Sequence, residues 1–248
     1  MDSMAMGISG QEARAKSTSW AITFSDLVTL MLSFFVLLLV ITNESEKHID
    51  RIINLLLDES YQQLKELESA DVKVERVTKG VRITMREGRL FNSLDAELRP
   101  EVLPLLSKAS ELIRISKIMN VFNDPTYRSL IKAIQDRKEK LHVEIRCEGH
   151  TDDLPLPPGS KYESNWDLST ARALNVVKQL SAYSGLPENS FSAMGYGEFR
   201  PAVDIRTVGK SSLALEQARA QNRRVEIYLD AFVRKQTDGQ LPFNSSFQ

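Results

Sequence analysis

The chain has 248 residues, a formal net charge of −1 and a pI near 6.4. This length allows one membrane-spanning segment together with one domain of ordinary size. The acidic and basic side chains almost balance, so no global field attracts nucleic acid, and composition excludes a binding protein that works by overall positive charge.

The first predicted element is a membrane-spanning helix over residues 20–42, preceded by a cytoplasmic tail over 1–19. The run from Trp20 to Ile41 is apolar except for Thr23, Ser25, Asp26, Thr29 and Ser33. Roughly 20 mostly apolar residues cross the hydrocarbon layer as a helix, so this run is long enough. Because Arg14 and Lys16 precede it and acidic residues follow it, the positive-inside rule predicts a cytoplasmic N-terminus and an exported C-terminal part. We expect an uncleaved signal anchor, since no small-residue cleavage site follows.

Asp26 is the only charged residue between Lys16 and Glu44. An aspartate at the centre of a membrane helix costs about 2.5 to 3.5 kcal/mol on insertion scales. Helical spacing places Thr23, Asp26 and Ser33 along one face, while large apolar residues cover the rest, so we expect Asp26 to face another helix rather than lipid. One interpretation is a protonated carboxyl that only hydrogen-bonds to a neighbour. The functional interpretation is a carboxylate that binds and releases a cation.

A second, amphipathic helix is predicted over residues 43–68. Its apolar positions follow the i, i+3, i+4, i+7 pattern, at Ile49, Ile52, Ile53 and Leu56, with Leu57 beside them. This face has to pack on something, and three possibilities remain open: a dimer contact that extends the membrane helix, the bilayer surface, or a pore that the helix occludes. Residues 69–80 are polar and predict a short linker.

Residues 81–231 predict an α+β domain. Alternating apolar residues indicate strands at 81–85, 141–147, 191–194 and 225–229, and helical spacing indicates helices at 100–115, 168–182 and 214–220. Residues 119–137 read as an additional loop and helix, and residues 232–248 as a C-terminal tail. The single cysteine, Cys147, lies on the apolar side of its strand, so we expect an inert core residue and no disulfide within the chain.

Three motifs in this region resemble one family. They are Gly149-His150-Thr151-Asp152, the pattern with Asn165, Leu168, Ser169, Arg172 and Ala173, and the run Asn222-Arg223-Arg224-Val225. Together they resemble the peptidoglycan-binding domain of the OmpA family over about residues 75–231. This implies an α/β sandwich domain with a mixed sheet behind the single membrane helix and the juxtamembrane helix.

The whole chain resembles the MotB family of stator subunits, because the membrane run contains Phe24-Ser25-Asp26-Leu27 and Ser164 to Ser169 fit the same family. The resemblance implies a homodimer in the bacterial inner membrane, a periplasmic C-terminal domain, and five MotA-like subunits around two copies of this chain. Cation binding and release at Asp26, with Thr23 as a further ligand, would drive rotation of that ring. The amphipathic residues Ile49, Ile52, Ile53 and Leu56 would then form a plug.

The resemblance also implies how the wall is held. Peptidoglycan stem peptides carry a diaminopimelate group with an ammonium and a carboxylate. Asp152 would accept the ammonium and Arg172 would clamp the carboxylate, while Asn165, Thr151 and Leu168 would shape the pocket. Without the family pattern, Asp152 would read as a turn cap and Arg172 as a residue of a solvated helix face. His150 does not indicate a hydrolase or metal site, because no second histidine or nucleophile lies at ligand spacing, and no enzyme activity or cofactor is expected.

Several alternatives remain open from the sequence. The transported cation is Na⁺ or H⁺, with a slight preference for Na⁺ from the FSDL pattern. The process is flagellar motility or, in a related membrane motor, Zorya-type phage defence. A passive anchor between membrane and peptidoglycan, without ion transport, is the alternative of a different class. A transducer of the TolR or ExbD type shares the membrane aspartate but not the later motifs.

Overall fold

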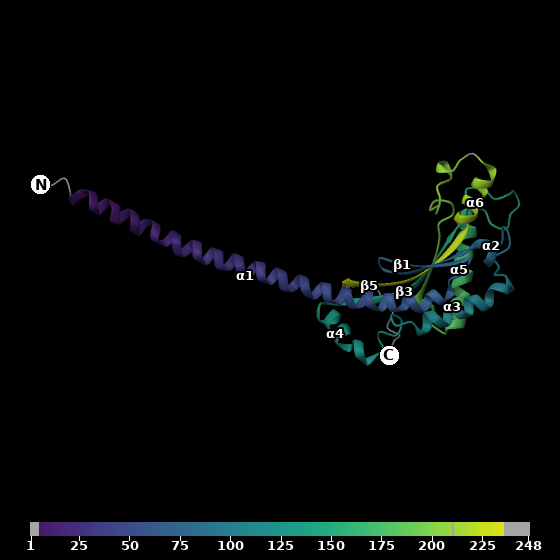
Figure 1. Ribbon diagram of the computed structural model, residues 1–248, viewed down its shortest axis with the longest axis horizontal. Coiled ribbons are helices and arrows are strands. Elements are labelled where there is room, and N and C mark those ends of the chain that lie inside the picture. Colours follow the sequence, from purple (N-terminus) through teal and green to yellow (C-terminus); the bar gives the residue numbers. More distant parts are fainter. Residues whose placement is uncertain (1–4, 210, 236–248) are drawn as a thin grey trace. The chain divides into compact units, whose positions relative to one another are not determined.

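The computed structural model describes residues 5–209 and 211–235, and it describes side chains at 20–40, 47–209 and 211–235. The chain divides into two compact units, Met1–Asp50 and Arg51–Gln248. The long helix α1 (Ala5–Leu64) begins in the first unit and ends in the second (Figure 1). Most of the predicted C-terminal tail lies outside the described residues.

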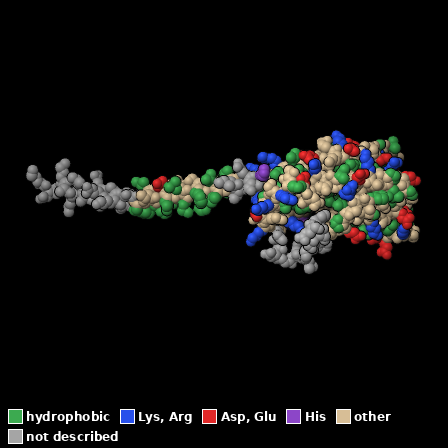
Figure 2. Space-filling view, turned by 90° about the horizontal axis from the view of Figure 1, so that it is seen from below, with side chains coloured by type: hydrophobic (Ala, Val, Ile, Leu, Met, Phe, Trp, Pro, Cys, Tyr) green, Lys and Arg blue, Asp and Glu red, His purple; other side chains and the backbone are tan. Residues whose placement is uncertain are grey.

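The first unit contains the predicted membrane segment. Among the described residues, one stretch of helix, Trp20–Val40, has the length and composition needed to cross a bilayer. All of its side chains are exposed, including large ones such as Phe34, Phe35 and Leu39, and green apolar side chains predominate along it in Figure 2. An exposed apolar surface of this kind is suited to lipid or to other membrane helices.

The second unit begins with the last turns of α1, and these pack on their own domain. Ile53, Leu56 and Leu64 are buried, and the hydroxyl of Ser60 accepts a hydrogen bond from the backbone N–H of Ile118 (3.3 Å). A short 3-10 turn, Lys65–Leu67, follows. Part of the apolar face of the predicted helix 43–68 therefore packs within the chain itself. None of the three possibilities given in the sequence analysis included this arrangement.

The core of the second unit is a five-stranded sheet with the order β1-β2-β5-β3-β4. The strands are β1 (Val72–Val77), β2 (Gly80–Arg86), β3 (Glu139–His150), β4 (Phe191–Gly195) and β5 (Arg224–Lys235). Only β3 and β4 run parallel, and the other neighbours are antiparallel. The predicted mixed sheet is confirmed, and Cys147 is fully buried on β3 as expected, where burial raises the pKa of its thiol.

Helices cover this sheet. They are the short α2 (Glu87–Leu90), then α3 (Leu103–Ile115), α4 (Arg128–Asp136), α5 (Asn165–Ser184) and α6 (Ser212–Asn222). Helix α5 packs on β3 and β4, α3 packs beside α5, and α4 contacts β3. The predicted α+β class is confirmed, and α4 occupies the additional segment expected over 119–137.

Two boundaries differ from the sequence prediction. The segment 69–80, predicted as a linker, contains β1, which pairs with β2 along its whole length. Strand β5 continues to Lys235, beyond the expected start of the tail at residue 232, because the long β3 offers it a partner as far as Glu139.

Candidate functional site

Asp26 lies on the exposed surface of α1, in a shallow depression lined by Ala21, Ile22, Thr23, Ser25, Asp26 and Thr29. The hydroxyl of Thr23 donates to the carbonyl of Trp20 (2.9 Å), and that of Thr29 donates to the carbonyl of Asp26 (3.0 Å). These bonds use the hydroxyl protons and leave oxygen lone pairs available. Among the described residues, no hydrogen bond reaches the Asp26 carboxylate, so it is open to an external partner.

A second site is built where β3 ends and α5 begins. Two glycines on the sheet, Gly149 and Gly195, let the helix backbone approach closely: an added Cβ at Gly149 would lie 2.1 Å from the carbonyl oxygen of Ser169. At the helix start, the hydroxyl of Ser164 accepts a hydrogen bond from the backbone N–H of Asp167 (3.3 Å). This packing fixes the first turns of α5 beside the loop that follows His150.

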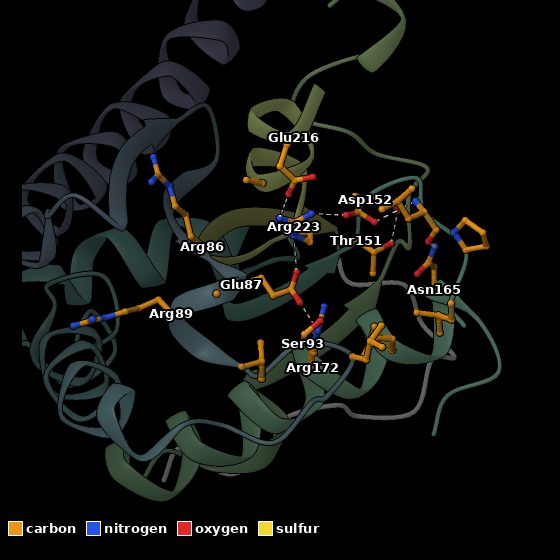
Figure 3. A pocket seen from close by; sticks show the side chains of 18 of the residues that line it. Arg86, Glu87, Arg89, Ser93, Thr151, Asp152, Asn165, Arg172, Glu216 and Arg223 are labelled. Atoms are coloured by element: carbon orange, nitrogen blue, oxygen red, sulfur yellow. Dashed lines mark hydrogen bonds and ion pairs between the residues drawn. The ribbon is translucent and has the colours of Figure 1, made fainter. Parts of the chain in front are cut away.

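The five residues predicted for peptidoglycan binding line one pocket of about 660 Å³. They are Thr151, Asp152, Asn165, Leu168 and Arg172, from the loop after β3 and from α5. Figure 3 labels all of them except Leu168. The sequence motifs lie far apart along the chain, and the fold brings them together. Their role in binding stays a prediction.

Arg172 is 2% exposed, which differs from the solvated helix face considered from the sequence. Its Nε donates to the carbonyl of Asp95 (2.9 Å), its guanidinium stacks over the ring of Phe91 (5.3 Å), and it forms an ion pair with Glu87. Burial raises the pKa of Glu87, and the guanidiniums of Arg172 and Arg223 only partly offset this. Arg172 is thus held rigidly at the base of the pocket.

Asp152 carries the second predicted charge, and it is also paired within the chain. Its carboxylate accepts a hydrogen bond from Arg223 (2.6 Å) and another from the backbone N–H of Leu154 (3.2 Å). Arg223 also lies 3.5 Å from Glu87. The pocket therefore contains a row of alternating charges, Arg172, Glu87, Arg223 and Asp152, whose ion pairs are drawn in Figure 3.

The neutral pocket residues have structural partners. The side-chain amide of Asn165 donates to the carbonyl of Leu154 (3.0 Å) and to the carboxylate of Glu198 (2.7 Å), which ties α5 to the two loops at its start. The hydroxyl of Thr151 donates to the carbonyl of Asp152 (3.1 Å). Leu168 is buried and supplies an apolar part of the wall.

His150 lies beneath the pocket and not in it. Its side chain is buried, stacks on Tyr196 (5.5 Å between ring centroids), and lies 3.8 Å from Glu148 and 3.9 Å from Glu226. Burial lowers the pKa of His150 to about 4. Glu148, His150 and Glu226 are close enough together to hold a metal ion, but Glu148 is already paired with Arg146, and Glu226 with Arg224. The arrangement fits a buried structural cluster.

Glu87 and Arg223 were not predicted as pocket residues. Arg223 belongs to the Asn-Arg-Arg-Val motif, and membership of that motif could have indicated that it lies near Asp152. No sequence pattern indicated Glu87. It follows β2, and it reaches Arg172 on α5 through the pairing of β2 with β5 and of β5 with β3, on which α5 packs.

Comparison with known proteins agrees with this fold. Residues 111–226 match the OmpA family. The second unit is therefore an OmpA-like domain. Residues 9–59 match a second family, described as the membrane MotB of the proton-channel complex MotA/MotB. With both matches in this order, the chain is similar to the MotB family in its N-terminal part and to the OmpA family in its C-terminal domain; these are stator and cell-wall anchor families, not enzymes.

Individual relatives cover different shares of the chain. The Bacillus subtilis (strain 168) protein named "Uncharacterized protein YtxE" is 27% identical over 89% of this chain and 91% of its own length. Motility protein B of the same organism is 30% identical over 64% of this chain, which spans 48% of that relative. A crystal structure described as that of a MotB-like protein from Desulfovibrio vulgaris has the same fold, with a TM-score of 0.53 at 19% identity over 75% of this chain and 98% of that one.

Proposed function

We propose that this chain is the peptidoglycan-anchored, ion-conducting B subunit of an inner-membrane rotary motor, most directly a flagellar stator. The observation that carries the proposal is a combination of two features in one chain: a carboxylate on a membrane helix with no partner among the described residues, and a pocket with paired opposite charges. A passive anchor would need the pocket but would have no use for Asp26. The same motor in a Zorya-type defence system would use both sites in the same way.

In the wall pocket, the residues suit a zwitterionic ligand. The guanidinium of Arg172 is oriented by Asp95 and Phe91, and it already holds one carboxylate in the pocket, that of Glu87. Asp152 offers a carboxylate to an ammonium group, and Leu168 provides apolar contact between them. The diaminopimelate group of a peptidoglycan stem peptide carries this pair of charges, and its capture would hold the subunit still.

In the membrane, Asp26 is proposed to bind the cation and Thr23 to add an oxygen ligand. A hard cation such as Na⁺ takes several oxygen ligands, so a neighbouring subunit has to complete the shell. The neutralised carboxylate and the free carboxylate differ by one charge at hydrophobic depth. One charge crossing 100 mV supplies about 2.3 kcal/mol, several times RT, which is enough to favour a different register of the surrounding ring.

The proposed partners come from the similarity to the MotB family. We propose a homodimer within five MotA-like subunits, with the N-terminus in the cytoplasm and the OmpA-like domain in the periplasm. Purification of the native complex and a count of its subunits tests the stoichiometry. Ion flux in sodium-free and sodium-containing buffer tests the cation, and we expect flux to depend on Na⁺; undiminished flux without sodium would assign H⁺ instead.

The plug-like role is proposed for the juxtamembrane part of α1 that includes Ile49 and Ile52. Ile49, Ile53 and Leu56 are buried, so these three side chains would have to become exposed before they could occlude a pore. Deletion of residues 47–52 should raise ion leak in cells that express the partner subunits. Unchanged leak would exclude the plug.

The wall-binding half of the proposal is tested by sedimentation with purified peptidoglycan. The full chain in detergent should pellet with the wall, and Arg172→Ala should remain in the supernatant. Arg206→Ala is the matched control, because Arg206 is 86% exposed and pairs only with Asp204 among the described residues. Equal pelleting of Arg172→Ala and the unchanged protein would refute the pocket assignment, provided that both melt cooperatively.

A further inference from the structure

The pocket already contains one copy of each charge that its proposed ligand would bring. Glu87 presents a carboxylate to Arg172, and Arg223 presents a guanidinium to Asp152. Glu87 and Arg223 lie 3.5 Å from each other, so together they resemble a bound zwitterion (Figure 3).

The burial of these groups explains why such a pairing exists without ligand. The side chains of Arg172 and Glu87 are 3% and 9% exposed. A buried charge whose partner is removed is strongly destabilised, so Arg172 needs a carboxylate at all times. A carboxylate that takes the place of Glu87 would keep Arg172 paired throughout.

We propose that Glu87 is an internal ligand of the pocket, which holds the carboxylate position on Arg172 and is displaced when the peptidoglycan group binds. This inference rests on the proposed wall-binding function. The exchange conserves charge: one carboxylate replaces another at Arg172, and the ligand ammonium replaces Arg223 at Asp152.

The displaced groups have other partners at the rim. Arg223 also donates to Glu216 (2.8 Å), a side chain that is 58% exposed. Glu87 lies 3.5 Å from Arg223 and can keep it as a partner after it leaves Arg172. Exchange therefore leaves no charge without a counter-ion, but only when the ligand supplies both charges. A ligand with the ammonium alone cannot replace Glu87, which makes Glu87 a determinant of specificity.

The test measures binding of two synthetic stem tetrapeptides to the full chain in detergent. One has meso-diaminopimelate at its third position, and the other has lysine, which lacks the side-chain carboxylate. Glu87→Gln removes the competing charge with little change in shape. We expect it to bind the diaminopimelate peptide about tenfold more tightly, the factor for one charge-assisted hydrogen bond, with no gain for the lysine peptide.

Glu188→Gln is the matched control, because it makes the same change at an exposed residue that does not line the pocket; its affinity should stay within about twofold, the range of a surface charge. Glu87→Asp retains the charge on a shorter side chain and should bind with intermediate affinity, which covers the case in which Glu87→Gln does not fold. Weaker or unchanged binding by both Glu87 variants would overturn the proposal.

One further variant separates the failure of this inference from the failure of the proposed function. Glu87→Gln combined with Arg172→Gln keeps the pocket neutral and should lose binding. If the unchanged chain binds, this double variant does not, and Glu87→Gln shows no gain, the internal-ligand proposal alone is wrong. If the unchanged chain binds neither peptide nor peptidoglycan, the proposed wall-binding function is wrong, and the internal ligand with it.

Discussion

At the scale of single residues, the pocket depends on the shape of one guanidinium. Arg172 contacts a carbonyl, an aromatic ring and a carboxylate at once, which a lysine ammonium cannot do in the same geometry. Arg172→Lys keeps the charge, so the fold should survive, but peptidoglycan affinity should fall about tenfold or more. Pelleting at graded peptidoglycan concentrations measures this, with Arg206→Lys as the exposed control. Undiminished affinity would show that charge alone suffices.

His150 determines a second residue-scale property, the response of stability to acid. Its pKa is about 4 in the fold and near 6.5 when unfolded, so the unfolded chain binds a proton first as pH falls. Neutral His150 therefore makes its full contribution to the free energy of unfolding above pH 6.5. This contribution is lost progressively as the pH falls toward 4, and the total loss is at most about 3 kcal/mol. The pKa of Glu226 is also lowered, since its hydrogen bonds from Tyr228 and Arg224 outweigh burial, and this acts in the same direction below pH 4.5.

Urea unfolding of the full chain in detergent at pH 7 and pH 5 tests this. We expect lower stability at pH 5, and a smaller difference between the two pH values for His150→Gln. His48→Gln changes an exposed histidine and should leave the difference as it is. A His150→Gln chain with the full pH dependence would assign the effect to other groups.

At the scale of elements, the contact of α5 with the sheet positions the pocket. Gly149→Ala would place a Cβ against the backbone of Ser169, where no flexible side chain can give way. We expect a loss of about 1–3 kcal/mol in stability, together with weaker peptidoglycan binding, because the start of α5 has to move. Gly209→Ala is the control, since its added Cβ meets no atom within 4 Å among the described residues. Equal unfolding midpoints for the two variants would contradict this account of the packing.

The sequence predicted the elements in which apolar residues recur at regular spacing. It missed an element in which charged residues interrupt that spacing. Helix α5 and strand β3 follow clear periods, and their bounds agree with the sequence within a few residues; β5 begins where its period predicts but continues to Lys235. Strand β1 was read as a linker because Lys73, Glu75 and Arg76 alternate with its valines. Charged side chains are typical of an edge strand, and β1 is at the edge of the sheet.

At the scale of the whole molecule, local motifs predicted the pocket but not its internal charges. Asp152 and Arg172 belong to short patterns that can be read directly, and the structure brings both to one pocket. The partner of Arg172 is Glu87, which is placed by strand pairing between distant segments. No local spacing contains that information, because it exists only after the sheet has formed.

Substitutions in the membrane site and in the wall pocket should each remove one function and leave the other intact. Arg172→Ala is expected to lose peptidoglycan but to co-purify with the partner membrane subunits, and Asp26→Asn is expected to retain peptidoglycan. Pelleting and co-purification of each variant measure this directly. Loss of both properties in either variant would show that the sites are not separate functions.

The central claim is that Asp26 carries a cation across the membrane. The most direct measurement is ion flux through the native complex in cells, compared for the unchanged chain, Asp26→Asn and the polar control Ser33→Ala, which changes a residue on the same helix face. We predict that Asp26→Asn abolishes flux while the complex still assembles, and that Ser33→Ala retains most of it. Full flux through an assembled Asp26→Asn complex would contradict the account and leave a passive anchor.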